Sequence, residues 1–211
     1  MPTVADPAKR AVLIHDAFRL EWLSIGWMVI EGAIAIGSGL TANSLLLVAF
    51  GIDSIIELAS ASVLVWRLSV ELREGQAFSG ATERRASRIA GGLLFALALY
   101  VVGAAGIGLW RHHGAEFSAP GIILAVAAIP IMYFLSRGKL TVAEQLGSRA
   151  LRADAVESIT CGWLSFVVVL GLAAQLVLGA WWVDPLASLA IVYFLIKEGR
   201  EAWEGGECRC D

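Results

Sequence analysis

The sequence predicts an all-α integral membrane protein, a six-transmembrane-helix bundle with both the N- and C-termini in the cytoplasm. Three observations predict this fold class: the composition, a series of long apolar segments, and the one-sided distribution of basic residues. Hydrophobic residues make up 58% of the 211 positions and charged residues 17%, against about 45–50% apolar residues in a soluble domain. One soluble core could not hold this much apolar surface, so part of it must face lipid.

Each predicted helix corresponds to an apolar segment bounded by charged or turn residues. The first begins near Leu20, after a charged stretch that lacks the apolar region of a signal peptide. The second and fourth end before basic loops, the third carries no charge between Ile89 and Trp110, and the fifth contains several ionisable residues. The sixth is the shortest and opens with Asp184-Pro185, a pair typical of an N-cap and the first helical position. The segments are 20–38, 44–66, 89–110, 119–136, 151–178 and 181–196.

We expect these helices to form one transmembrane domain over residues 20–200. Residues 1–19 would then be a cytoplasmic N-terminal segment, and residues 201–211 a short cytoplasmic tail that contains cysteines. The cysteines do not suggest a disulfide framework, because Cys161 lies alone in an apolar segment. The net charge of −3 gives no reason to expect a nucleic-acid partner, and the lipid bilayer is the expected one.

The basic residues predict the orientation. Of the 16 Lys and Arg residues, all but Arg111 fall on the side of the two termini and the even-numbered loops. Positively charged loops are retained in the cytoplasm, so this side is expected to be cytoplasmic. Lys139 is assigned here to the loop after the fourth helix. The predicted location is the cell membrane, as a multi-pass protein, or the inner membrane in a host that has two.

Ionisable side chains inside the predicted helices are the main candidates for function. Each costs about 2.5–3.5 kcal/mol on insertion scales, so such residues are usually retained for a role. Asp53 and Glu57, four residues apart, share one face of the second helix. Asp154, Glu157 and Cys161 share one face of the fifth. The alternative for each carboxylate is a hydrogen bond to a neighbouring helix, and for the cysteine simple packing as a small hydrophobe.

The depths of these residues are compatible with a common site. With a rise of 1.5 Å per residue, Asp53 and Cys161 each lie about 13 Å below the outer edge of the bilayer core. Glu57 and Glu157 each lie about 20 Å below it. Carboxylates and a thiolate are metal ligands, so the sequence predicts a four-ligand metal site near the middle of the membrane.

For other polar residues the sequence supports more than one role. Asp154 is nearer the inner interface, where a solvated or capping role competes with metal binding. Glu31, in the middle of the first helix, could support a ligand or serve a gate or proton path, whereas Glu21 is expected to be solvated near the membrane edge. Two further groups could bind metal but have simpler alternatives: the outer-loop pair His112 and His113, and the tail pair Cys208 and Cys210.

At these residues the chain resembles the cation diffusion facilitator (cation efflux) family. Ser44 to Glu57 (SLLLVAFGIDSIIE) resembles the family's second helix with its acidic pair four residues apart. Ser148 to Cys161 (SRALRADAVESITC) is similar to its fifth helix, and Trp182 to Pro185 (WVDP) to the start of its sixth. The family's usual ligands are Asp or His paired with Asp. Here Glu57, Glu157 and Cys161 stand at three of those positions. We expect a short form without the family's C-terminal cytoplasmic domain.

The resemblance implies a transporter and not an enzyme. It implies export of a divalent cation from the cytoplasm in exchange for protons, and a homodimer. No resident cofactor is expected, since the metal ion is the cargo. Four ligands with one sulfur suit Zn²⁺, with Co²⁺, Cd²⁺, Fe²⁺ and Mn²⁺ as further candidates. The alternatives are a membrane metal sensor or chaperone that binds without transport, and an intramembrane enzyme, for which no nucleophile–base pair is evident.

Overall fold

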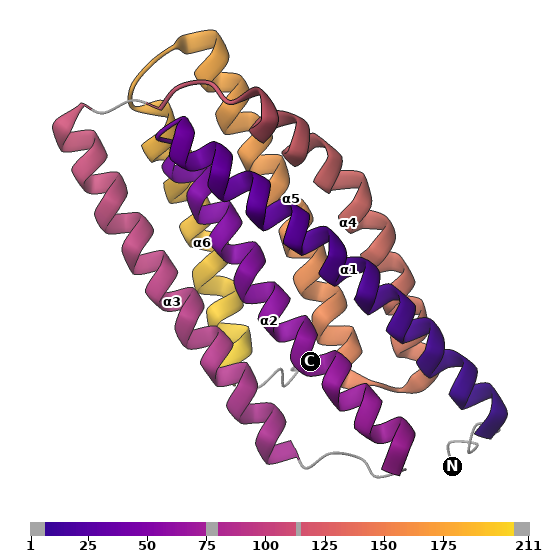
Figure 1. Cartoon of the computed structure of the whole chain (residues 1–211). Helices are drawn as coiled ribbons and strands as arrows, with labels where there is room; N and C mark the ends of the chain where they lie inside the picture. Colours follow the sequence, from indigo (N-terminus) through magenta and orange to yellow (C-terminus); the bar gives the residue numbers. More distant parts are fainter. Residues whose placement is uncertain (1–6, 75–79, 113–114, 205–211) are drawn as a thin grey trace.

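Six α-helices make up the part of the chain that the structure describes, residues 7–74, 80–112 and 115–204 of a computed structural model (Figure 1). They confirm the predicted all-α bundle. All the predicted segments lie within helices apart from a few boundary residues, and several helices are longer than predicted. The helices are α1 (Pro7–Thr41), α2 (Leu45–Glu74), α3 (Gly80–Arg111), α4 (Ala119–Leu146), α5 (Arg149–Leu178) and α6 (Val183–Glu204).

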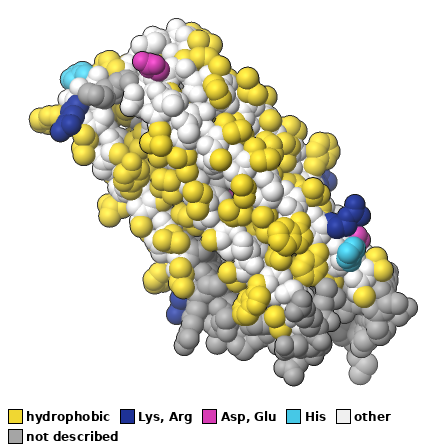
Figure 2. Space-filling view, viewed as in Figure 1, with side chains coloured by type: hydrophobic (Ala, Val, Ile, Leu, Met, Phe, Trp, Pro, Cys, Tyr) yellow, Lys and Arg dark blue, Asp and Glu magenta, His cyan; other side chains and the backbone are white. Residues whose placement is uncertain are grey.

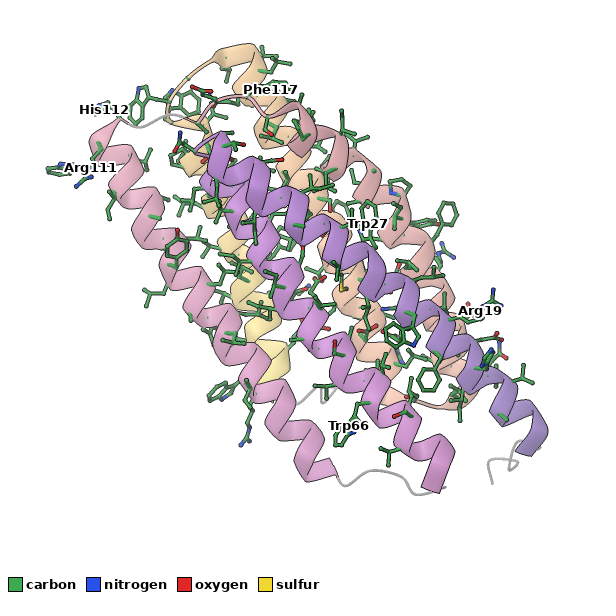
Figure 3. All side chains as sticks on the ribbon, viewed as in Figure 1. Arg19, Trp27, Trp66, Arg111, His112 and Phe117 are labelled. Carbon is green, nitrogen blue, oxygen red and sulfur yellow. The ribbon has the colours of Figure 1, made fainter. Side chains whose placement is uncertain are left out.

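The extra helical turns lie at one end of the bundle. α1 begins at Pro7 and not near Leu20, and α4 continues to Leu146 beyond the predicted end at residue 136. A helix can extend past the lipid core because its backbone groups remain bonded to one another while its polar side chains are solvated. Arg19 lies toward this end and Arg111 at the opposite one (Figure 3). We call these the basic end and the Arg111 end.

α2 lies at the centre of the bundle. It contacts α1, α3, α5 and α6, while α4 packs against α1 and α5, and α3 packs against α6. Five of the helices, all except α6, are long and apolar enough to cross a membrane. Apolar side chains cover much of the surface seen in Figure 2. Among the exposed apolar side chains of the bundle are Leu99 and Val177, at 75% and 81% exposure. The chain is therefore a multi-pass helical membrane protein.

Two glycines bring α1 and α2 into close contact. A Cβ atom added at Gly39 would lie 2.8 Å from the backbone nitrogen of Val48, and one at Gly51 would lie 2.9 Å from that of Ile36. Any side chain at either position would push the two backbones apart. Small residues of this kind allow membrane helices to pack closely. The contact brings Glu31 of α1 against Ser54 of α2, with 2.8 Å between the serine hydroxyl and the carboxylate.

Asp184 fixes the register between α2 and α6. We expected it to cap its own helix, and this was wrong, because α6 already begins at Val183. Its carboxylate instead accepts hydrogen bonds from the hydroxyl of Ser44 at 2.5 Å and the backbone N–H of Leu45 at 2.8 Å. These are groups at the start of α2, where N–H groups have no partner within the helix. The bonds align the starts of α2 and α6, and the two helices run parallel.

A two-residue turn joins α4 to α5. Gly147 ends α4 in the left-handed conformation with φ 63°, and Ser148 caps α5 by accepting a bond from the N–H of Leu151 at 3.4 Å. So short a connection holds the two helices antiparallel and adjacent. Residues at similar distances from the turn, such as Lys139 and Asp154, therefore lie opposite each other.

Candidate metal centre

Three buried carboxylates from two helices converge inside the bundle. Asp53, Glu57 and Glu198 are 0%, 4% and 7% exposed. One oxygen of each lies within 4.8 Å of the oxygens of the other two. The helical spacing of i and i+4 directs both α2 side chains the same way. The shared register with α6 places Glu57 about 18 Å below Leu45 and Glu198 about 21 Å below Asp184, so they lie in one layer.

Most of these carboxylate oxygens have no hydrogen-bond partner. Both oxygens of Asp53, both of Glu57 and one of Glu198 are buried and unpaired. Buried charges without partners are strongly unfavourable, and proteins keep them paired, protonated or bound to a metal. Oxygens that bind one ion at about 2.0–2.6 Å lie within about 5 Å of one another. The donor set and its spacing therefore fit a divalent cation.

Glu157 and Cys161 of α5 lie beside this group. Glu157 is half-buried and close enough to Asp53, Glu57 and Glu198 to repel each of them electrostatically. Cys161 is fully buried, and its thiol donates to Oε1 of Glu31 at 3.5 Å. Thus Asp53 and Glu57 meet Glu198, with Glu157 as a near neighbour. The ligand set predicted from the sequence remains a prediction.

Glu31 is held by three donors. The indole N–H of Trp27 bonds to one of its carboxylate oxygens at 2.5 Å, and the other accepts from Ser54 and from Cys161. Both oxygens are thus used within the protein. This arrangement favours a role in which Glu31 orients the Cys161 thiol and the adjacent face of α2.

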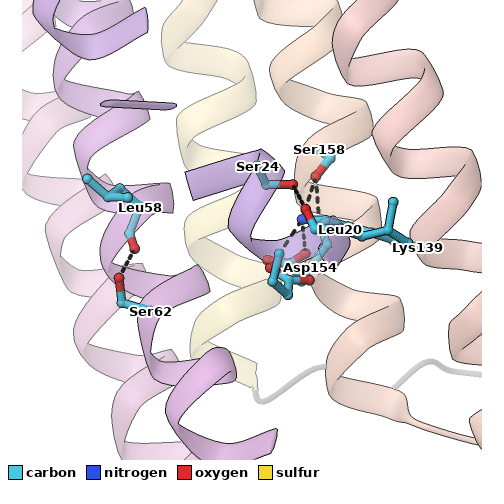
Figure 4. A network of polar contacts seen from close by, with 8 residues as sticks. Leu20, Ser24, Leu58, Ser62, Lys139, Asp154 and Ser158 are labelled. Carbon is cyan, nitrogen blue, oxygen red and sulfur yellow. Dashed lines mark hydrogen bonds and ion pairs between the residues drawn. The ribbon is translucent and has the colours of Figure 1, made fainter. Parts of the chain in front are cut away.

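Asp154 lies in a different cluster. Its carboxylate is 2.5 Å from the ammonium of Lys139 (Figure 4). The same ammonium is 3.4 Å from Glu21. Two expectations were wrong here. Glu21 is not solvated but 0% exposed, and Lys139 is not in a loop but buried within α4. Both errors arise because α4 extends beyond its apolar segment, which carries the lysine into the protein interior between α1 and α5.

Glu198 was not among the residues predicted from the sequence, because it lies beyond the predicted end of the sixth apolar segment. A signal was nevertheless present. The buried face of α6 recurs at helical spacing and includes this residue: Asp184, Ser188, Ile191, Leu195 and Glu198. Continuing that stripe past the apolar segment would have placed a third carboxylate on the face of α6 that meets α2.

The weaker candidate groups lie elsewhere. Cys208, Cys210 and His113 fall outside the described residues. His112 is exposed at the Arg111 end, and its ring lies 4.3 Å from that of Trp181 between centroids. Among the described residues, this end contributes nothing to the buried carboxylate group.

Two comparisons relate this chain to known proteins. Residues 22–205 match the Cation efflux transmembrane domain. Over 181 residues the chain is 29% identical to an uncharacterized transporter of Synechocystis sp., a match that covers 84% of this chain and 58% of the relative. The chain thus spans somewhat more than half the length of that relative. Because the domain match extends over most of its residues, the chain belongs to the cation efflux family.

Proposed function

We propose that this protein exports a divalent metal cation from the cytoplasm by exchange for protons, with Asp53, Glu57 and Glu198 as the principal ligands. The observation that carries the proposal is the group of unpaired, buried carboxylate oxygens. Family membership supports a cation as the cargo. The one-sided basic residues support a cytoplasmic basic end, since positively charged loops are retained there.

Proton exchange follows from the ligand chemistry. Carboxylates bind a metal only when they are deprotonated, so binding releases protons and protonation favours release. Three carboxylates in a poorly hydrated interior repel one another and therefore bind either protons or a metal ion. A bundle that opens this site to each side of the membrane in turn would couple the two fluxes. Glu157, half-buried beside the site, is suited to pass ions or protons between it and the basic end.

Zinc is the first ion to test. The oxygen-rich donor set also accepts Mn²⁺, Fe²⁺ and Co²⁺, whereas a contribution from the Cys161 thiol would favour Zn²⁺ and Cd²⁺. Intrinsic affinities do not decide selectivity among these ions, which depends on geometry and on the metals available.

The test is metal uptake into inverted membrane vesicles at two imposed pH gradients. In such vesicles the cytoplasmic face is outward, so export is measured as accumulation in the lumen. An acidic lumen should accelerate uptake, and reversing the gradient should slow it. Asp53→Ala should abolish this uptake. Cells that express the variant should also lose their tolerance to toxic zinc, although the protein remains inserted in the membrane at wild-type levels.

Two results would contradict the proposal. Cells with Asp53→Ala that survive toxic zinc as well as wild type would show that this residue is not a ligand. Stoichiometric metal binding without flux at either gradient would favour a membrane metal sensor or chaperone.

A further inference from the structure

A buried ammonium group, that of Lys139, lies among carboxylates, and Figure 4 shows it beside Asp154 and Ser158. The Nζ atom of Lys139 lies 2.5 Å from Asp154, 3.4 Å from Glu21 and 3.5 Å from the hydroxyl of Ser158. Lys139 and Glu21 are 0% exposed, and Asp154 is 7% exposed. The cluster joins α1, α4 and α5, and neither Lys139 nor Glu21 is among the ligands proposed above.

The formal charges of this cluster do not balance. One ammonium faces two carboxylates, and the second oxygen of Glu21 is buried without any hydrogen-bond partner. An unpaired carboxylate oxygen in the interior is unfavourable. A divalent cation in place of the ammonium would balance both carboxylates. The surrounding donors, carboxylate oxygens and the Ser158 hydroxyl, are those that hard divalent cations bind.

The position of the cluster suits an ion moving between the basic end and the metal centre. Asp154 precedes Glu157 by three residues on α5, which places it about 4.5 Å nearer the basic end on the same face. Lys139 lies about 10 Å from the end of α4 at Leu146. Its long side chain can therefore turn toward that interface when it leaves the carboxylates, as lysines near helix ends do.

We propose that Glu21 and Asp154 form a second divalent-cation subsite, which the Lys139 ammonium fills when no ion is there. An ion arriving from the basic end displaces the ammonium, binds Glu21, Asp154 and Ser158, and then moves to Glu157. The returning ammonium restores the resting pair and prevents the ion from remaining bound. The direction of movement rests on the proposed function, whereas ion binding at the subsite does not.

The test counts bound ions on the full chain in detergent by equilibrium dialysis with Mn²⁺. In Lys139→Met the subsite carboxylates lose their cation, so this variant should bind a second ion per chain at concentrations where wild type binds one. The gain in affinity at the second site should be on the order of tenfold or more. Lys139→Arg keeps the positive charge and should behave as wild type. Adding Asp154→Asn to Lys139→Met should remove the second ion.

A further variant separates this inference from the proposed function. Lys139→Met combined with Asp53→Asn, Glu57→Gln and Glu198→Gln should still bind one ion per chain. If wild type binds no ion but this variant does, the proposed function fails and the subsite stands. If Lys139→Met remains folded and binds no more Mn²⁺ than wild type, the subsite is refuted.

The wild-type chain provides the same test if the Lys139 variants do not fold. At higher Mn²⁺ concentrations it should bind a second, weaker ion as the ammonium is displaced. Glu21→Gln leaves the Lys139–Asp154 pair intact and should abolish that second ion. A wild-type chain that saturates at one ion per chain, or a second ion unaffected by Glu21→Gln, would overturn the inference.

Discussion

At the scale of single residues, the central feature is the contrast between satisfied and unsatisfied buried carboxylates. Glu31 and Asp184 have hydrogen-bond donors on both carboxylate oxygens. Asp53 and Glu57 have none. Carboxylates of the first kind stabilise the fold, and those of the second kind need a cation or a proton. This contrast separates the carboxylates that hold helices together from those that we propose as metal ligands.

Glu198 provides the most discriminating substitution. Glu198→Gln removes one carboxylate ligand while keeping the side chain's size, and should reduce metal transport on the order of 100-fold. Glu201→Gln is the matched control, because Glu201 is exposed on the same helix. Vesicle uptake measured at equal protein levels checks the prediction. Equal uptake by Glu198→Gln and the control would show that α6 contributes no ligand to the site.

Cys161 should influence which ion is carried. Cys161→Ser replaces a soft thiol by a hard hydroxyl of similar size, so transport of Cd²⁺ and Zn²⁺ should fall relative to Mn²⁺, by about tenfold. Competition between Cd²⁺ and Mn²⁺ in one uptake assay measures this ratio directly. An unchanged ratio would mean that the thiol only packs and bonds to Glu31.

Two of the three carboxylates that converge in the candidate site could be predicted from the sequence. Asp53 and Glu57 were evident because a charged pair at helical spacing interrupts an apolar segment. Glu198 and Lys139 were not, since both lie where hydropathy no longer marks the helix, and their burial depends on packing between helices distant in sequence. Periodicity identifies which residues share a face, but only tertiary contacts decide which faces meet.

At the scale of helices, the Asp184 carboxylate connects the fold to the site. It aligns the starts of α2 and α6, and that alignment places Glu57 and Glu198 in one layer. The sequence placed the first helical residue at Pro185, two residues after the observed start at Val183. It could not show that the carboxylate would cap a helix some 140 positions earlier in the chain.

Removing this carboxylate should weaken both stability and metal binding. Asp184→Ala leaves the first N–H groups of α2 and the Ser44 hydroxyl without their acceptor, at a cost of about 1–3 kcal/mol. Thermal unfolding followed by tryptophan fluorescence should show a lower melting temperature. Asp184→Asn keeps one oxygen acceptor, so its melting temperature should lie between those of the wild type and Asp184→Ala. If Asp184→Ala melts at the wild-type temperature, the Asp184 carboxylate does not hold the starts of α2 and α6 together.

At the scale of the whole molecule, the bundle encloses a polar interior in an apolar surface. α2 is surrounded by four other helices, so its charged face avoids lipid, while large apolar side chains on the other helices face outward. The fold class was predictable because composition and hydropathy report directly on the solvent around the helices. The lengths of the helices beyond the lipid were not, since hydropathy does not describe that region.

Orientation can be tested with exposed positions at the two ends of the bundle. Glu116 lies beside the Arg111 end, and Glu144 lies in the last turn of α4 at the basic end. In a chain with serine in place of its natural cysteines, Glu116→Cys should react with a membrane-impermeant maleimide in intact cells. Glu144→Cys should react with the same maleimide only after the cell membrane is permeabilised. The reverse pattern would invert the proposed direction of transport.

The proposed function requires that buried carboxylates from α2 and α6 hold the ion. X-ray absorption at the zinc edge, on chain loaded with one equivalent of Zn²⁺, tests it most directly. We expect oxygen neighbours at about 2.0–2.2 Å with no more than one sulfur, and loss of this pattern in Glu198→Gln. Two sulfur neighbours at about 2.3 Å would instead place the ion on Cys208 and Cys210 and would show that the buried carboxylates do not hold it.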